Sequence, residues 1–170
     1  MDTYSDPQSL KDYERGRDDF DYDILKEISI PDNSSIIEIG CGNGRFLRKL
    51  HALNPTIKIT GLDSSRTGID SCTDGIFICT DVRGYVSEIK YDYVLCFQTL
   101  EHFPDPDTIV TKLLELGDKL IISVPNKYLD TCDTHLQHWN VDEFNTFMNK
   151  HIAGKSKIFN NEFNIIFISD

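Results

Sequence analysis

The stretch Ile36–Leu47, which reads IIEIGCGNGRFL, has the residue types and spacing of a ligand site. Three glycines at alternate positions, Gly40, Gly42 and Gly44, follow directly after an apolar run, and Glu38 stands two residues before them. Glycine lets the backbone turn sharply and approach a ligand closely. Where a strand passes into a helix, the N–H groups at the helix start attract an anionic group. The segment therefore predicts a site lined by bare backbone.

The spacing of the glycines disfavours the two common phosphate-binding loops and leaves a nicotinamide dehydrogenase as a distant alternative. A dinucleotide fingerprint, G-x-G-x-x-G, needs glycine at position 45, where the sequence has Arg45. A P-loop needs Gly-Lys-Ser/Thr, which this segment lacks. We expect instead a ligand with a carboxylate and an amine. The loop N–H groups would bind the carboxylate, and an acid such as Glu38 would help to hold the amine.

Five short apolar runs are continuous rather than alternating, as in strands that are buried on both faces of a parallel sheet. They cover residues 35–40, 57–63, 76–81, 91–98 and 119–124. Segments that can be helical lie between them, at residues 43–53, 64–72, 82–89 and 105–117. This order predicts five β/α units in one α/β domain. In such a sheet, ligands bind at the carboxyl ends of the strands.

Local signals mark the ends of two helices and one turn. In residues 105–117, Asp105 is a predicted N-cap, Pro106 opens the first turn and Gly117 ends the helix. The predicted buried face of this helix is Ile109, Leu113 and Leu116. A later helix is expected after Asn140, with Glu143 as its capping-box partner.

The C-terminal segment predicts a closing antiparallel hairpin. Asn160 and Asn161 stand between two β-rich runs, and asparagine tolerates the positive φ of tight turns.

The motif E-x-G-x-G-x-G after a buried strand resembles motif I of the class I S-adenosylmethionine-dependent methyltransferases. Asp63 ends the second apolar run and Ser64 follows it; an acidic residue of that family at this strand end accepts hydrogen bonds from two ribose hydroxyls, as a carboxylate can. Asp81 and Val82 resemble the residues that bind the adenine amino group and pack on its ring. Gln98 follows the fourth run at a further motif position.

The resemblance covers roughly residues 20–170 and implies a Rossmann-like, doubly wound sheet, mostly parallel with a C-terminal antiparallel hairpin. It implies S-adenosylmethionine as the cofactor and residues 21–170 as the methyltransferase domain. Residues 1–20 become a possible substrate lid. The implied cofactor-binding residues are Glu38, Gly40, Cys41, Gly42, Asp63, Ser64, Asp81, Val82 and Gln98. Structural alternatives exist: Asp63 and Asp81 are also suited to be helix N-caps, and Gly44 to serve helix–strand packing alone.

Two histidines are the candidate catalytic residues. His102 follows the fourth strand in a segment that resembles the family, and His135 lies in the long loop 126–144. Methyl transfer is a one-step displacement, so positioning can supply much of the acceleration. A general base is needed only where the nucleophile must lose a proton. His102 is equally suited to order its loop, and Trp139 to anchor a lid.

The leading hypothesis is methyl transfer to a small or medium-sized acceptor, with no metal ligand. A second hypothesis is a metal-assisted RNA 2′-O-methyltransferase, since small-RNA 3′-end methyltransferases have an E-x-x-E-H run and a later histidine. Here Gln98 replaces the first glutamate, so that Glu101, His102 and His135 or His138 would form only a partial site. A third hypothesis is a cofactor-binding module without catalysis.

Composition limits the partners and the compartment. The net charge of −11 disfavours nucleic-acid binding, which depends on neutralising phosphates. Five cysteines without a CxxC pair predict reduced, buried and structural thiols and a reducing, cytoplasmic location. The acid-rich N-terminus is unlike a signal peptide, and no apolar run approaches the roughly 20 residues of a membrane helix. The acceptor and the oligomeric state are not specified.

Overall fold

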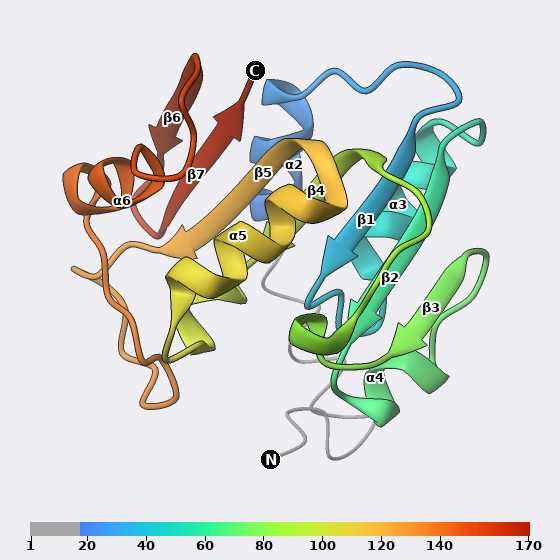
Figure 1. Ribbon diagram of the computed structural model, residues 1–170, viewed down its shortest axis with the longest axis horizontal. Coiled ribbons are helices and arrows are strands. Elements are labelled where there is room, and N and C mark those ends of the chain that lie inside the picture. The colour runs from blue at the N-terminus through green and yellow to red at the C-terminus, as the bar shows by residue number, and fades with distance from the viewer. Residues whose placement is uncertain (1–17) are drawn as a thin grey trace. The chain divides into compact units, whose positions relative to one another are not determined.

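All five apolar runs form strands in the computed structural model, which describes residues 18–170. The ends of the strands differ by one or two residues from the predicted ones. The strands are β1 (Ser35–Ile39), β2 (Lys58–Asp63), β3 (Ile76–Cys79), β4 (Tyr91–Phe97) and β5 (Gly117–Pro125). Figure 1 shows them in chain order from blue to orange. The chain divides into two compact units, the first ending at Tyr85 and the second beginning at Val86.

The first unit contains three parallel strands in the order β3-β2-β1. Ile37 of β1 lies opposite Thr60 of β2, which in turn lies opposite Ile76 of β3. Because β1 and β2 are parallel, their carboxyl ends lie at the same edge of the sheet. Helix α3 (Arg45–Leu53) follows β1, and the short helix α4 (Arg66–Asp70) follows β2. The segments that follow β1 and β2 therefore both begin at this edge of the sheet.

A buried ion pair attaches the first described helix, α2 (Asp18–Glu27), to α3. The carboxylate of Asp21 is fully buried and accepts two hydrogen bonds from the Arg45 guanidinium, one of them 2.7 Å from Nη2. Lys49 Nζ lies 3.3 Å from the same carboxylate. Arg45, which replaces the third glycine of a dinucleotide fingerprint, thus has a structural partner.

The predicted N-terminal segment 1–20 lies mostly outside the described residues. Its last three residues belong to α2, so the predicted domain boundary after residue 20 falls inside a helix.

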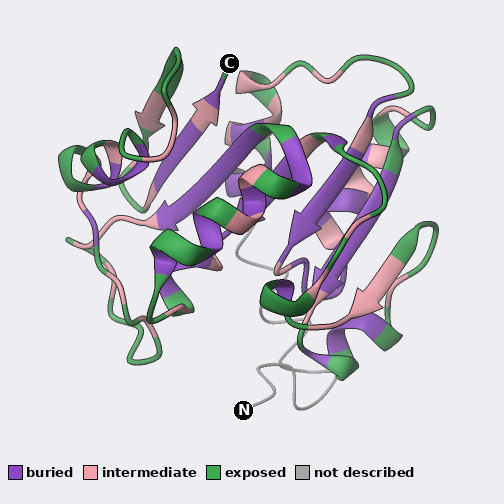
Figure 2. Ribbon diagram, viewed as in Figure 1, coloured by how far each residue is buried: buried purple, intermediate pink, exposed green. Residues whose placement is uncertain are grey.

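The second unit contains four strands in the order β4-β5-β7-β6. Strands β4 and β5 are parallel, β7 (Asn164–Ser169) is antiparallel to β5, and β6 (Ser156–Asn160) is antiparallel to β7. The predicted C-terminal hairpin is confirmed, and its two strands lie side by side in Figure 1. The most buried strands of this unit are β4, β5 and β7, which are largely purple in Figure 2.

The hairpin turn differs from the prediction. Asn160 ends β6, and the described non-glycine residues with positive φ are Asn33, Asp74 and Gln98. The Asn161 side chain closes the turn instead, because its Oδ1 accepts hydrogen bonds from the N–H groups of Phe163 (2.9 Å) and Asn164 (2.8 Å).

The predicted ends of helix α5 (Pro106–Leu116) are confirmed. Asp105 is its N-cap, and Ile109, Leu113 and Leu116 are buried. Gly117 starts β5 directly, and a Cβ there would lie 2.5 Å from the Tyr91 carbonyl oxygen of β4. A side chain is therefore excluded by the close approach of the neighbouring strand.

The predicted capping box at the start of α6 (Val141–Met148) is also confirmed: Asn140 Oδ1 and the Glu143 side chain each accept from the other residue's N–H at 2.9 Å.

The segment 82–89 does not form an α-helix. It contains only the 3₁₀ turn η1 (Val82–Gly84), so the third predicted β/α unit lacks its helix. Ser87 Oγ accepts from the Ile89 N–H at 3.2 Å, a local bond that competes with helical backbone pairing. Within residues 18–170, we find no helix that is long and apolar enough to cross a membrane.

Removing the Asp21 carboxylate should destabilise the first unit. Asp21→Ala leaves the mostly buried Arg45 without its charge partner, which typically costs about 3 kcal/mol of unfolding free energy. The control Asp23→Ala loses an exposed ion pair with Lys26, and that loss should cost less than about 1 kcal/mol. Urea unfolding followed by circular dichroism measures both. Equal losses in the two variants would contradict the role of the buried pair.

Candidate functional site

The glycine loop and Asp63 meet at the carboxyl ends of β1 and β2. Asp63 Oδ2 accepts a hydrogen bond from the Gly42 N–H at 2.7 Å, and Oδ1 accepts from the Ser65 N–H at 2.7 Å. The N–H groups of Gly40 and Cys41 donate to the Leu62 carbonyl at 2.8 and 3.0 Å. The motif residues of the two strands are therefore joined by direct hydrogen bonds.

These bonds occupy three donors of the loop. The N–H groups of Gly40, Cys41 and Gly42 all donate to Leu62 or Asp63, so the predicted binding of a carboxylate would fall to the N–H groups nearer the start of α3. Their donors are used because the loop has to pack against the end of β2. What the glycines contribute is conformation: Gly40 and Gly42 have φ of 74° and 56°, values that cost other residues free energy.

Gly44 has a packing role. Its φ is 70°, and a Cβ at this position would lie 2.5 Å from Cε1 of Phe77 in β3. The chain turns into α3 directly over this ring, with Gly44 as the N-cap. The packing interpretation of Gly44 is thus supported by the structure.

Glu38 and Cys41 lie inside the first unit. Glu38 is buried in β1, opposite Gly61 of β2. Burial raises the pKa of the Cys41 thiol far above its usual value, and the nearby Glu38 and Asp63 carboxylates raise it further. Burial likewise raises the pKa of Cys72 to about 11. Both thiols are therefore protonated at neutral pH, and Cys41 contributes a small neutral side chain to the loop.

The five cysteines are thiols rather than disulfides, as predicted. Cys41 and Cys96 are buried, but Cys79 is only partly buried and Cys132 is exposed.

Asp81, at the end of β3, is the N-cap of η1 and accepts from the Arg83 N–H at 2.9 Å. The Arg83 guanidinium is bonded to the same carboxylate and holds the pKa of Asp81 below its usual range. Val82 beside it is buried. The N-cap interpretation of Asp81 is confirmed, and its exposed carboxylate remains a predicted adenine contact.

Asp63 is not a helix N-cap, because Ser65 occupies that position of α4 and its Oγ accepts from the Gly68 N–H at 3.2 Å. Ser64 is exposed between them.

Gln98, the predicted site residue of the second unit, follows the end of β4 with φ of 48°. Its N–H donates to the Ser123 carbonyl at 3.0 Å, and its Nε2 donates to Ser123 Oγ at 3.2 Å. Ser123 lies in the neighbouring strand β5 and is fully buried. A non-glycine residue held in the left-handed region at a strand end is typical of functional positions.

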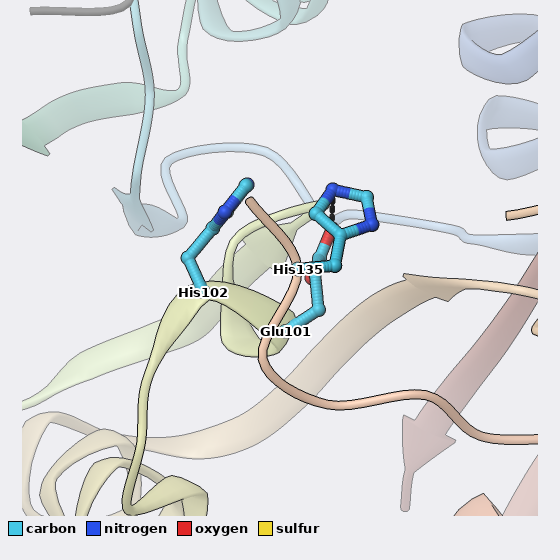
Figure 3. A group of neighbouring side chains, drawn as sticks. All are labelled: Glu101, His102 and His135. Atoms are coloured by element: carbon cyan, nitrogen blue, oxygen red, sulfur yellow. Dashed lines mark ion pairs between the residues drawn. The ribbon is translucent and has the colours of Figure 1, made fainter. Parts of the chain in front are cut away.

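Glu101, His102 and His135 form a cluster in the second unit, drawn in Figure 3. Glu101 and His102 belong to the 3₁₀ turn η2 (Leu100–His102), while His135 comes from the loop between β5 and α6. Glu101 is fully buried, and its Oε1 lies 3.9 Å from His135 Nε2. The rings of His102 and His135 meet edge to face, with centroids 4.7 Å apart. The two candidate catalytic histidines are therefore neighbours.

Asp130, which was not among the predicted site residues, contacts His135 of this cluster. Its oxygens lie 2.7 and 2.8 Å from His135 Nδ1, and one lies 3.0 Å from His138 Nδ1. Burial alone would raise the pKa of Asp130, but hydrogen bonds from His135, Cys132 and His138 hold it below its usual range. An aspartate five and eight residues before two histidines of one loop was the available signal.

Trp139 packs against aromatic side chains of the protein. It is buried, and its ring packs against Phe144 and Phe147 of α6 at centroid distances of 5.4 and 5.5 Å. The Lys127 N–H donates to its carbonyl at 2.9 Å. This agrees with an anchor for the start of α6.

Solved structures with the same fold carry different activities. A crystal structure of the plantazolicin methyltransferase BpumL with a triazolic desmethylPZN analogue and SAH matches 98% of this chain and 93% of its own, with a TM-score of 0.73 and 21% identity. The [4+2]-cyclase SpnF matches 86% of this chain and 60% of its own, with a TM-score of 0.70 and 17% identity. The predicted Rossmann-like, mostly parallel fold with a C-terminal antiparallel hairpin is confirmed.

Sequence comparison gives a curated relative and a family. Trans-aconitate 2-methyltransferase from Azoarcus sp. (strain BH72) is 25% identical over 135 residues, which are 75% of this chain and 53% of that enzyme. The chain thus spans about half the length of this relative. The predicted kinship with S-adenosylmethionine-dependent methyltransferases is confirmed. Residues 17–148 match the family described as methionine biosynthesis protein MetW, and the chain belongs to the MetW family.

Proposed function

We propose that this protein binds S-adenosylmethionine and transfers its methyl group to a small or medium-sized acceptor. The observation that carries the proposal is the glycine loop after β1, held to Asp63 at the end of β2 by the Gly42 hydrogen bond. Membership of the MetW family, a methyltransferase relative and a neighbour with bound SAH support it.

The first unit fits the cofactor by the chemistry of its side chains. Each oxygen of Asp63 accepts one backbone hydrogen bond, and a carboxylate oxygen has capacity for a second, which suits two ribose hydroxyls. Gly40 and Gly42 place no side chain between the ligand and the loop. Glu38 would serve the amine, and Ser64, Asp81 and Val82 the ribose and adenine. Gln98 stays a predicted cofactor-binding residue, on the resemblance of its segment alone.

The bound cofactor would supply an electrophilic methyl group, and the protein would have to position the acceptor and take up its proton. His135 is suited to hold a proton at Nε2, because Asp130 accepts the hydrogen bond from Nδ1. His102 is exposed and adjoins His135 through its ring edge. We therefore assign the proposed base to this histidine pair.

The acceptor class rests on charge and on the names of relatives. The net charge of −11 disfavours a nucleic-acid acceptor. The curated relative is named for trans-aconitate and the structural neighbour for plantazolicin. The five unbridged cysteines support a reducing, cytoplasmic environment for the reaction.

Asp63→Ala should weaken S-adenosylmethionine binding, because the ribose hydroxyls lose their acceptor. We expect a loss of about 1–3 kcal/mol, or about tenfold to a hundredfold in affinity, by isothermal titration calorimetry. Asp70→Ala, which removes an exposed carboxylate from α4 in the same unit, is the control and should bind normally. Undiminished binding in Asp63→Ala, with binding by the wild type, would refute the ribose assignment.

Asp81→Ala and Arg83→Ala separate the two roles of Asp81. If Asp81 binds the adenine amino group, its removal should weaken cofactor binding several-fold. Arg83→Ala removes the guanidinium partner of Asp81 but keeps the Asp81 carboxylate, and should leave the affinity unchanged. Calorimetric titration of both variants with S-adenosylhomocysteine makes the comparison. A matching loss in Arg83→Ala would show that the ion pair, not an adenine contact, carries the effect.

A further inference from the structure

We propose that Glu101, His102 and His135 form a binding site for a divalent first-row transition metal, such as Mn²⁺, Co²⁺ or Zn²⁺. One ligand atom from each residue lies within 4.8 Å of the other two. Two imidazoles and a carboxylate are a ligand set that such metals bind, with further positions for water or an oxygen-bearing ligand. The site lies wholly in the second unit, and its occupancy does not depend on methyl transfer.

The distance between Glu101 and His135 suits a bridging cation. Glu101 Oε1 and His135 Nε2 are 3.9 Å apart, which is too long for a hydrogen bond. A metal has bonds of about 2.0–2.2 Å to carboxylate oxygen and imidazole nitrogen, so it can span two atoms at this separation. In Figure 3 the two groups face one another across this gap. A bound cation would also stabilise the fully buried carboxylate of Glu101.

Asp130 prepares His135 as a ligand. A metal-bound histidine usually donates its other ring N–H to a carboxylate, which fixes the tautomer and the ring orientation. Asp130 lies 2.7 and 2.8 Å from His135 Nδ1, and its side chain is only 3% exposed. With the proton on Nδ1, the lone pair of His135 is on Nε2, the atom that faces Glu101.

His102 has the corresponding arrangement on the exposed side. Its Nδ1 lies 3.3 Å from the Thr134 carbonyl, and donation there places the ring lone pair on Nε2. The exposed position of His102 gives a cation access from solvent.

Backbone hydrogen bonds hold the two contributing segments together. The N–H groups of Leu136 and Gln137 both donate to the Glu101 carbonyl, at 2.8 and 3.1 Å. Gln137 Nε2 donates to the Phe103 carbonyl at 3.2 Å. His135 is therefore fixed against η2 in the absence of any ion, and metal binding needs only a small closing movement of side chains.

The alternative to a metal is a protonated His135 that forms an ion pair with Asp130 and Glu101. Both explanations need the two carboxylates, but only the metal site takes up a cation stoichiometrically. Only the metal site also needs His102 as a ligand.

The test is titration of the full chain, treated with EDTA and then freed of it, with Co²⁺ at pH 7.5. Calorimetry and visible absorption should each report one equivalent of Co²⁺ bound per chain. Zn²⁺ should raise the melting temperature of the protein, and EDTA should reverse this rise. Glu101→Gln, His102→Ala and His135→Ala should each weaken Co²⁺ binding at least tenfold. Asp130→Asn should weaken it about tenfold to a hundredfold by releasing the His135 ring.

Two histidines provide matched controls. His138→Ala removes the other partner of Asp130, and His151→Ala removes a histidine paired with Asp107 outside the cluster; both should bind Co²⁺ like the wild type. Because His102 is exposed, His102→Ala should fold normally, which circular dichroism in EDTA verifies. The absence of Co²⁺ binding in the wild type, or binding that survives His102→Ala and Glu101→Gln, would overturn the proposal. S-adenosylmethionine titrated in EDTA tests the proposed function separately.

Discussion

The hydrogen bond from the Gly42 N–H to Asp63 is the interaction on which the candidate cofactor site depends. It joins the turn after β1 to the end of β2, and it explains why a loop of glycines keeps one conformation despite its entropy. With Gly40 and Cys41 bonded to Leu62, the loop satisfies its own donors within the protein. Its shape is therefore present before any ligand binds, which lowers the cost of ordering on binding.

Main-chain hydrogen bonds also fix a loop in the second unit. There a carbonyl, that of Glu101, accepts two N–H groups from the loop between β5 and α6. Backbone bonds place His135 beside η2, and the Asp130 carboxylate then orients its ring. In each unit, main-chain hydrogen bonds fix a loop, and the carboxylate of one aspartate accepts a hydrogen bond from a residue of that loop. The main chain thus sets where these titratable groups lie, and the Asp130–His135 contact sets the orientation of the ring.

Features with local causes could be predicted from the sequence, and features that depend on distant partners could not. Continuous apolar runs gave five strands, and the caps at Asp105 and Asn140 follow from side chains within one turn. The use of the loop N–H groups, the Arg45–Asp21 pair and the role of Asp130 depend on residues brought together by folding. The segment 82–89, which was predicted to be helical, forms only the 3₁₀ turn Val82–Gly84.

The geometry of His135 makes its two proposed roles exclusive. Asp130 accepts the Nδ1 proton, so Nε2 is the single site at which the ring can take a proton or coordinate a metal. An occupied metal site would hold His135 through Nε2 and so remove it as a general base. With the site empty, Nε2 would be available to the proton of the acceptor. Metal occupancy would therefore determine whether His135 can act as the base.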